Sequence, residues 1–419
     1  MKITVKTILI ISCMLIAFSA SALAETKFSY DGQIRLRVEF SNKSFAQERH
    51  AQQYNDLRTR LGFTFEPTDM AKVYIQFQDS RRLGSPSSGG LTSSNNVDLH
   101  QAYFELQCPK HPSFHLKGGR FEVNYGNQRV FGAVGWHNIG RSWEGLIASV
   151  RPENFNIDFF LLKKMEINSG GYNRDTDIFG AYAKLLKAKV DLFAFYELDA
   201  DSNGYVEAQL KRFNIGTFYK NNFDNFDVTF QGNYQLGTFV PDGIPDSTVL
   251  DIAAFMINGE FGYAFEGKSK ARVALGLDYT SGDDGSDTTK YKAYTNAYYT
   301  GHAYRGYFDE FLGSPMHGLI DIMLRAKGKV TSNILIKGDF HYFKAAENYS
   351  YIVDEGTTDE KTGLSSNIGY EFDLTLVRKI ENGAVFTAGL SVFAPEEEYA
   401  GYSDKKMGMW SYLMWTVNF

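Results

Sequence analysis

The side chains best suited to chemistry lie in one stretch, residues 114–150, which is rich in glycine, arginine and tryptophan. Three arginines and two tryptophans recur through it: Arg120, Arg129, Arg141, Trp136 and Trp143. A guanidinium group can hold a carboxylate through two parallel charge-assisted hydrogen bonds, and an aromatic ring can stack on a sugar. Packing of the rings within the loop or at a membrane interface is the simpler alternative, which we favour. Connections this long are usually functional or disordered, and the aromatic residues argue against disorder. We therefore expect an ordered, functional loop.

Further arginines lie in two segments, residues 28–40 and 55–65, in which apolar and polar residues alternate. In the first segment Ile34, Leu36 and Val38 share one face, opposite a charged face. The polar faces of the two segments carry four arginines: Arg35, Arg37, Arg58 and Arg60. Similar segments of about ten residues recur to the end of the chain, which is the pattern of transmembrane β-strands.

The lengths of the connections distinguish a membrane barrel from a soluble β-sandwich, whose strands also alternate. Short turns such as 66–70 and 221–225 alternate with long polar connections such as 281–317 and 344–366. Outer-membrane barrels have short turns on one side and long loops on the other, and a sandwich gives no reason for this. We predict an all-β fold, a single transmembrane antiparallel barrel of 18 strands, with 16 as the alternative and both termini periplasmic.

The first 24 residues have the form of a secretory signal peptide. Lys2 and Lys6 precede an apolar core, and an Ala-Leu-Ala cleavage site ends at Ala24. The apolar run is shorter than the roughly 20 residues that a membrane-spanning helix needs. We therefore expect a signal peptide at residues 1–24 and a barrel at residues 25–419, embedded in the lipid of the bacterial outer membrane.

Cysteine content and charge exclude several classes of protein. After removal of the signal peptide, Cys108 is the only cysteine, so neither an intrachain disulfide nor a cysteine-based metal site is possible. The whole chain has 43 basic and 49 acidic residues. Loss of Lys2 and Lys6 leaves a formal net charge of −8, which does not favour nucleic acid as a partner.

The last predicted strand covers residues 410–419 and ends in Phe419, with apolar residues at alternate positions before it. This ending resembles the C-terminal signal that the outer-membrane assembly machinery recognises. So apolar an edge strand would promote aggregation of a soluble protein. In a closed barrel we expect it to pair with the first strand.

The lumen is where function is expected, because a barrel of 16–18 strands leaves an aqueous channel. Rings of arginine or lysine select anions. The inward faces also carry acids such as Asp278, Asp321 and Glu371, so a ladder of ion pairs that stiffens the wall is an equally weighted alternative. The sequence leaves open whether residues 281–317 fold into the lumen or stand above it.

Five motifs recur in an order that resembles the alginate-export family of outer-membrane β-barrels. They lie at residues 56–60 (DLRTR), 99–103 (LHQAY), 119–142, 278–283 (DYTSGD) and 302–309 (HAYRGYFD). The resemblance implies an 18-stranded porin that exports an anionic polysaccharide through an arginine-lined constriction narrowed by loops. It implies that five arginines line the lumen or the constriction: Arg58, Arg60, Arg120, Arg129 and Arg141.

Arg120 fits this set only under one condition. In the alternating pattern Arg120 falls on the same face as the apolar residues Phe114 and Leu116. It therefore points inward only if a β-bulge intervenes, which we place at Gly118 and Gly119.

Other constellations predict no metal, cofactor or catalysis. The acidic residues 281–287 could bind calcium, but they lack EF-hand spacing, so we favour a solvated loop. His302 and Asp309 could form a metal pair, and a packed loop is the alternative that we favour. Neither a GxSxG elbow nor an HExxH helix occurs, so we do not expect an enzyme.

We therefore predict an outer-membrane channel for an anionic or saccharide solute, with a constriction that contains arginine. Its candidate site residues are Arg35, Arg37, Arg58, Arg60, Arg120, Arg129, Arg141, Trp136, His302 and Asp309. A general diffusion porin without anion preference and a closed structural or adhesive barrel are the alternatives.

Overall fold

The computed structural model describes most of the chain as strands. It covers residues 26–46, 50–84, 97–166, 168–169, 172–173, 175–199, 210–240, 249–354 and 360–419. The expected signal peptide, residues 1–24, lies outside the described residues. In the described part, no helix is both long enough and apolar enough to cross a membrane.

Eighteen strands form the wall of the molecule. They are β1 Lys27–Asn42, β2 Gln52–Thr68, β3 Ala71–Arg82, β4 Val97–Cys108, β5 His111–Phe121, β6 Trp143–Val150, β7 Phe155–Met165, β10 Thr176–Leu185, β11 Val190–Asp199, β12 Leu210–Phe223, β13 Phe226–Phe239, β14 Leu250–Ala264, β15 Arg272–Thr280, β17 Leu319–Lys329, β18 Ile334–Val353, β19 Lys361–Lys379, β20 Ala384–Pro395 and β21 Gly408–Asn418.

The remaining elements are short and lie in the connections. They are β8 Asn168–Ser169, β9 Tyr172–Asn173, β16 Lys290–Tyr291, the 3₁₀ helices η1 Gly301–Ala303 and η2 Glu381–Gly383, and the one-turn helix α2 Glu397–Ala400. β16 pairs in parallel with β14.

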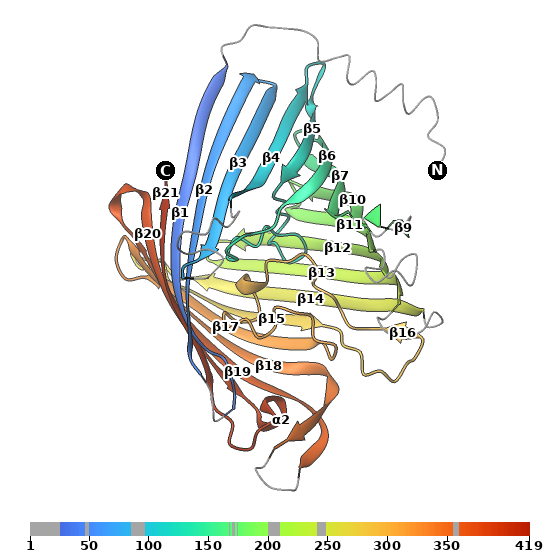
Figure 1. Cartoon of the computed structure of the whole chain (residues 1–419), viewed down its shortest axis with the longest axis vertical. Helices are drawn as coiled ribbons and strands as arrows, with labels where there is room; N and C mark the ends of the chain where they lie inside the picture. Colours follow the sequence, from blue (N-terminus) through green and yellow to red (C-terminus); the bar gives the residue numbers. More distant parts are fainter. Residues whose placement is uncertain are drawn as a thin grey trace.

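The wall closes on itself, because β1 pairs with β2 on one side and with β21 on the other. All eighteen neighbouring pairs are antiparallel, so the prediction of an 18-stranded barrel is confirmed (Figure 1). The closing seam is tight at its end. The amide of Gly32 donates to the carbonyl of Phe419 at 2.8 Å, and the Phe419 ring occupies the space that a side chain at position 32 would need.

The two faces of each strand have opposite character. On β1, the side chain of Ile34 lies on the outer face and is 46% exposed, whereas Arg35 points inward and is 4% exposed. Large apolar side chains cover the outer face of every part of the wall, as a lipid-facing surface requires. The predicted inward positions of Arg35, Arg37, Arg58 and Arg60 are confirmed.

The start of β1 and the end of β21 lie at the short-turn end of the barrel, since Lys27 pairs with Glu66 and Asn418 with Gln33. At the other end the connections are longer, with one difference from expectation. The predicted loop 344–366 is largely strand, because β18 continues to Val353 and β19 begins at Lys361. A register shift after Phe343 lets this hairpin extend beyond the wall.

Two long connections lie inside the ring of strands (Figure 1). We call them the β5–β6 loop, residues 122–142, and the β15–β17 loop, residues 281–318. The structure thus answers the question that the sequence left open, because the β15–β17 loop contacts the inward faces of the wall. The bonds that hold both loops define the candidate site.

Candidate solute pathway

Arginines of β1 and β2 hold the backbone of the β5–β6 loop. Arg35 donates to the carbonyl oxygens of Gly135 at 2.8 Å and His137 at 3.1 Å. Arg58 donates to the same two oxygens, each at 3.1 Å. Arg37 donates to the carbonyl of Trp136 at 2.7 Å and also pairs with Glu39 at 2.6 Å. The three guanidinium groups are buried, and these hydrogen bonds hold them against the loop.

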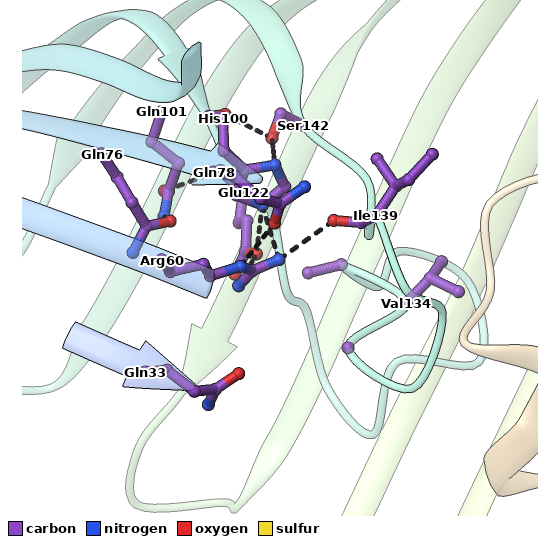
Figure 2. A network of polar contacts seen from close by, with 12 residues as sticks. Gln33, Arg60, Gln76, Gln78, His100, Gln101, Glu122, Val134, Ile139 and Ser142 are labelled. Carbon is purple, nitrogen blue, oxygen red and sulfur yellow. Dashed lines mark hydrogen bonds and ion pairs between the residues drawn. The ribbon is translucent and has the colours of Figure 1, made fainter. Parts of the chain in front are cut away.

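The two ends of this loop are held together by a second network (Figure 2). Arg60 donates to Glu122 at 3.1 Å and to the carbonyl of Ile139 at 3.1 Å. Nε2 of His100 lies 2.8 Å from the same Glu122 oxygen. Gly140, at φ +88°, lets the loop pass close by, since a Cβ there would lie 2.9 Å from Arg60.

His100 and Glu122 were not among the predicted site residues. His100 is an extra residue in β4, because Gln76 pairs with Gln101 and Phe77 with Leu99. This bulge turns the imidazole into the lumen beside Glu122. Strict alternation cannot reveal such a position, although the motif at residues 99–103 contains it.

We expect the docking of the β5–β6 loop to depend on acid pH through Glu122. Burial alone would raise the pKa of this carboxyl, but the His100 hydrogen bond and the Arg60 charge outweigh it and lower the pKa below the ordinary 4.5. A lowered pKa in the folded state stabilises the loop above pH 4.5, and this contribution is lost as the pH falls through the lowered value. Single-channel recordings from neutral pH to about pH 3 should show larger current fluctuations below pH 4.5.

The variants E122Q and E105Q separate this effect from general titration of the lumen. E122Q should behave at neutral pH as the wild type does in acid. Glu105 is also inward, but it pairs with Lys72 and Lys117 on the wall rather than with a loop, so E105Q should keep the transition. Identical pH profiles for the wild type and E122Q would exclude Glu122 as the cause.

The two inner loops share one buried ionic cluster on β15. Asp278 accepts a hydrogen bond from Arg129 of the β5–β6 loop at 2.5 Å and from Arg305 of the β15–β17 loop at 3.2 Å. All three side chains are at most 3% exposed. Arg129 therefore lies in the lumen as predicted, and its guanidinium group is already paired with a carboxylate of the wall.

Acidic side chains of β19 hold the β15–β17 loop in a complementary way. Glu371 accepts a hydrogen bond from the amide of Phe308 at 2.7 Å, and Asp373 accepts from the amide of Tyr307 at 3.2 Å. Donor side chains on β1 and β2 thus bind carbonyls of one loop, whereas acceptor side chains on β19 bind amides of the other.

The loops also bind each other across the lumen. Gly132 donates to the carbonyl of Tyr298, and Thr300 donates to the carbonyl of Gln128, each at 2.9 Å. The Trp136 ring stacks on His302 with centroids 3.9 Å apart, and Nδ1 of His302 lies 2.8 Å from Asp309. The predicted residues Trp136, His302 and Asp309 therefore meet as one packed unit.

Aromatic packing consolidates the loops against the wall. Phe131, Trp143 and Tyr298 form a buried cluster with side chains of β7, β10 and β11. Trp143 is 1% exposed, so it packs rather than presents a face to solute.

Asp283, in the acidic stretch that could have held calcium, accepts hydrogen bonds from the amides of Gly285 and Lys292.

Two predicted arginines lie apart from the others. The expected bulge at Gly118 and Gly119 is absent, because β5 pairs with β6 in unbroken register from Phe114 to Phe121. The inward placement of Arg120 is therefore wrong. It points outward and pairs with Glu144 at 2.8 Å. Arg141 lies within the β5–β6 loop, where it donates to the carbonyl of Gly132 at 3.3 Å.

Two cavities flank the start of the β5–β6 loop, and both lie toward the short-turn end. One of about 180 Å³ lies against β4–β7, and its charges pair with each other, as in Lys117 with Glu105 at 3.3 Å. The other, of about 240 Å³, lies against β12, β13, β14 and β17. A small solute can occupy either of these spaces beside the loops.

Comparison with known proteins agrees with this geometry. Residues 27–408 match the model of a family described as alginate export. No curated protein matches the sequence. Among solved structures, Pseudomonas aeruginosa OccK8 (OprE) is 10% identical at a TM-score of 0.58, covering 95% of this chain and 99% of that one. OccK2 (OpdF) of the same species, in complex with glucuronate, is 9% identical at 0.58, covering 94% and 98%. A BenF-like porin from Pseudomonas fluorescens Pf-5 is 8% identical at 0.60, covering 95% and 100%.

Proposed function

The chain belongs to the alginate-export family of outer-membrane β-barrels, and we propose that it is a channel with a preference for anionic, saccharide-like solutes. Its family and fold are those of channels and not of enzymes. We further propose that the short-turn end faces the periplasm, that residues 1–24 direct export to it, and that the assembly machinery recognises Phe419.

One observation carries the preference for anions. Among the described residues, neither Arg35 nor Arg58 has a carboxylate within ion-pair distance, although both are about 4% exposed. Their partners are the neutral carbonyls of Gly135 and His137 and the amide of Gln33. By contrast, the buried Arg212 is paired with Glu197 at 2.6 Å. Two positive charges are thus left uncompensated by direct pairing on one side of the lumen.

Uncompensated charge in a narrow, low-dielectric passage acts beyond its own contacts. Walls of low polarity focus the field and raise the local concentration of oppositely charged solutes. Positive side chains at a constriction accordingly favour anions. The inward faces also carry neutral amide and hydroxyl side chains, so a solute with both a carboxylate and hydroxyl groups would match this lumen.

A sugar acid combines those groups, and the similar barrel OccK2 was crystallised with glucuronate. Hydroxyl groups can exchange hydrogen bonds with the amide and hydroxyl side chains of the inward faces, and a carboxylate responds to the positive field. This chemistry supports a uronate-like solute for the present channel.

The reversal potential of single channels in a KCl gradient tests the proposal. We expect anion preference in the wild type, a smaller preference in R58Q, and a retained preference in R58K, because lysine keeps the charge. Preference for cations in the wild type would overturn the proposal. Equal permeability would identify a general diffusion porin, and a silent bilayer would identify a closed structural or adhesive barrel.

A further inference from the structure

The larger cavity lies between the β5–β6 loop and the wall opposite the loop's arginine anchors. Its volume is about 240 Å³, and Gly126, Asn127 and Arg129 of the loop form one side. Small-molecule sites typically enclose about 300–1,000 Å³. This cavity lies just below that range, so it suits a small ligand, the size of one sugar.

Positive charge predominates among its lining residues, with Arg129, Lys220 and Arg325 against a single acid, Glu260. Lys220 is exposed to the cavity side of β12 and makes no hydrogen bond or ion pair with the described residues. Glu260 is already shared by Arg272 at 2.7 Å and Arg325 at 3.3 Å. Among the described lining residues, the cavity therefore offers one ammonium group without a bonded partner and no carboxylate without one.

Behind the cavity, Arg129 and Arg305 share the carboxylate of Asp278, which lies directly opposite Asp321 on β17. The positive charge that is available to a ligand is therefore that of Lys220 and not of this cluster.

The neutral part of the lining suits a sugar ring. Phe218 and Tyr304 supply aromatic faces, and the guanidinium of Arg129 lies 3.9 Å from the Tyr304 ring centre, which fixes that ring. The Asn258 amide donates to the carbonyl of Leu277 at 3.1 Å, which leaves its oxygen as an acceptor, and Thr229 adds a hydroxyl. Aromatic faces beside a few polar groups are the usual lining of small-ligand sites.

We propose that this cavity is a binding site for one carboxylated sugar, reached from the short-turn end, with Lys220 holding the carboxylate and Phe218 and Tyr304 flanking the ring. The proposal rests on the proposed function and assigns attraction of the solute and direct contact with it to different residues. Arg35 and Arg58 supply the field while their donors hold the loop, and Lys220 supplies the direct contact. The smaller cavity lacks this property, because Lys117 there is paired with Glu105 at 3.3 Å.

Saturation-transfer NMR on the purified full barrel in detergent tests the site, with glucuronate as the probe and glucose as its uncharged analogue. We expect saturable transfer to glucuronate, much weaker transfer to glucose, and affinity for glucuronate about tenfold lower in K220Q, since one charge-assisted contact is lost. F218A should weaken the binding of both sugars. K327Q is the matched control, an exposed lysine on the strand that carries Arg325 but outside the cavity lining.

The outcomes separate this site from the proposed function. Equal losses of glucuronate affinity in K220Q and K327Q, or unchanged binding in K220Q and F218A, would overturn the site. Anion-selective currents would still support the proposed function in that case. Binding that depends on Lys220 in a cation-selective or silent barrel would support the site and reject the function. Absence of saturable transfer to glucuronate in the wild type would overturn the site whatever the currents show.

Discussion

Replacement of Asp278 by asparagine is expected to loosen both inner loops at once. The variant leaves Arg129 and Arg305, both buried, without the carboxylate that they share at 2.5 and 3.2 Å. Removal of one partner from a buried ion pair typically costs about 3–5 kcal/mol. The barrel wall itself is held by eighteen antiparallel strand pairings, so the loss should appear as undocking of the loops before the wall unfolds.

Urea titration followed by tryptophan fluorescence measures this, because Trp136, Trp143 and Trp410 lie in or against the loops. D278N should show an early transition that the wild type lacks. D227N is the matched control, since Arg272 retains Glu260 at 2.7 Å when its bond to Asp227 is lost. The double variant R129Q/D278N should lose less docking free energy than the sum of the losses in R129Q and D278N, because the two residues interact. Equal shifts in D278N and D227N would contradict the assigned role.

The double substitution R35Q/R58Q is expected to produce the largest change in current. It removes four hydrogen bonds to the carbonyls of Gly135 and His137. Bonds with a charged donor contribute about 1.5–3 kcal/mol each, so the β5–β6 loop should leave the wall. A barrel of this strand number is wide once it is free of its inner loops, and single-channel conductance should rise by about twofold or more.

High salt separates this structural effect from charge. Screening shortens the reach of fixed charges to a few ångströms at molar ionic strength, so a rise in conductance that persists there reports on the loop and not on the field. R35K/R58K is the control. It keeps both charges but loses the planar fork that spans two carbonyls, so it should keep anion preference with an intermediate conductance. Unchanged conductance in R35Q/R58Q would mean that other contacts suffice to hold the loop.

The wall could be predicted from the sequence because its rules are local. Alternation alone places Arg35 inward and Ile34 outward, and the structure agrees. Where a local rule is broken, prediction fails. His100 needs an extra residue in β4 to point inward, and Arg120 would need a bulge in β5 that does not form.

The roles of the inward arginines could not be predicted, because their partners are remote in sequence. Arg35 binds a carbonyl 100 residues away, and Trp136 stacks on His302 from a different loop. No local pattern encodes such contacts. A guanidinium group aimed into a lumen has the same sequence signature whether it meets a solute or a peptide carbonyl, and only the path of the loop decides between them. Lys220 has the inward parity and has no hydrogen-bond or ion-pair partner among the residues that the structure describes.

The distribution of the loop anchors along the chain bears on biogenesis. Trp136 lies against Arg37 near the beginning of the chain and against Trp410 and Tyr412 near its end. The β5–β6 loop therefore cannot reach its final position until the first and last strands have joined. Until then the lumen of the inserted protein is not narrowed by this loop, and docking of the loop is the last step of assembly. Variants that slow this final step would sensitise cells to large antibiotics without reducing the amount of inserted protein.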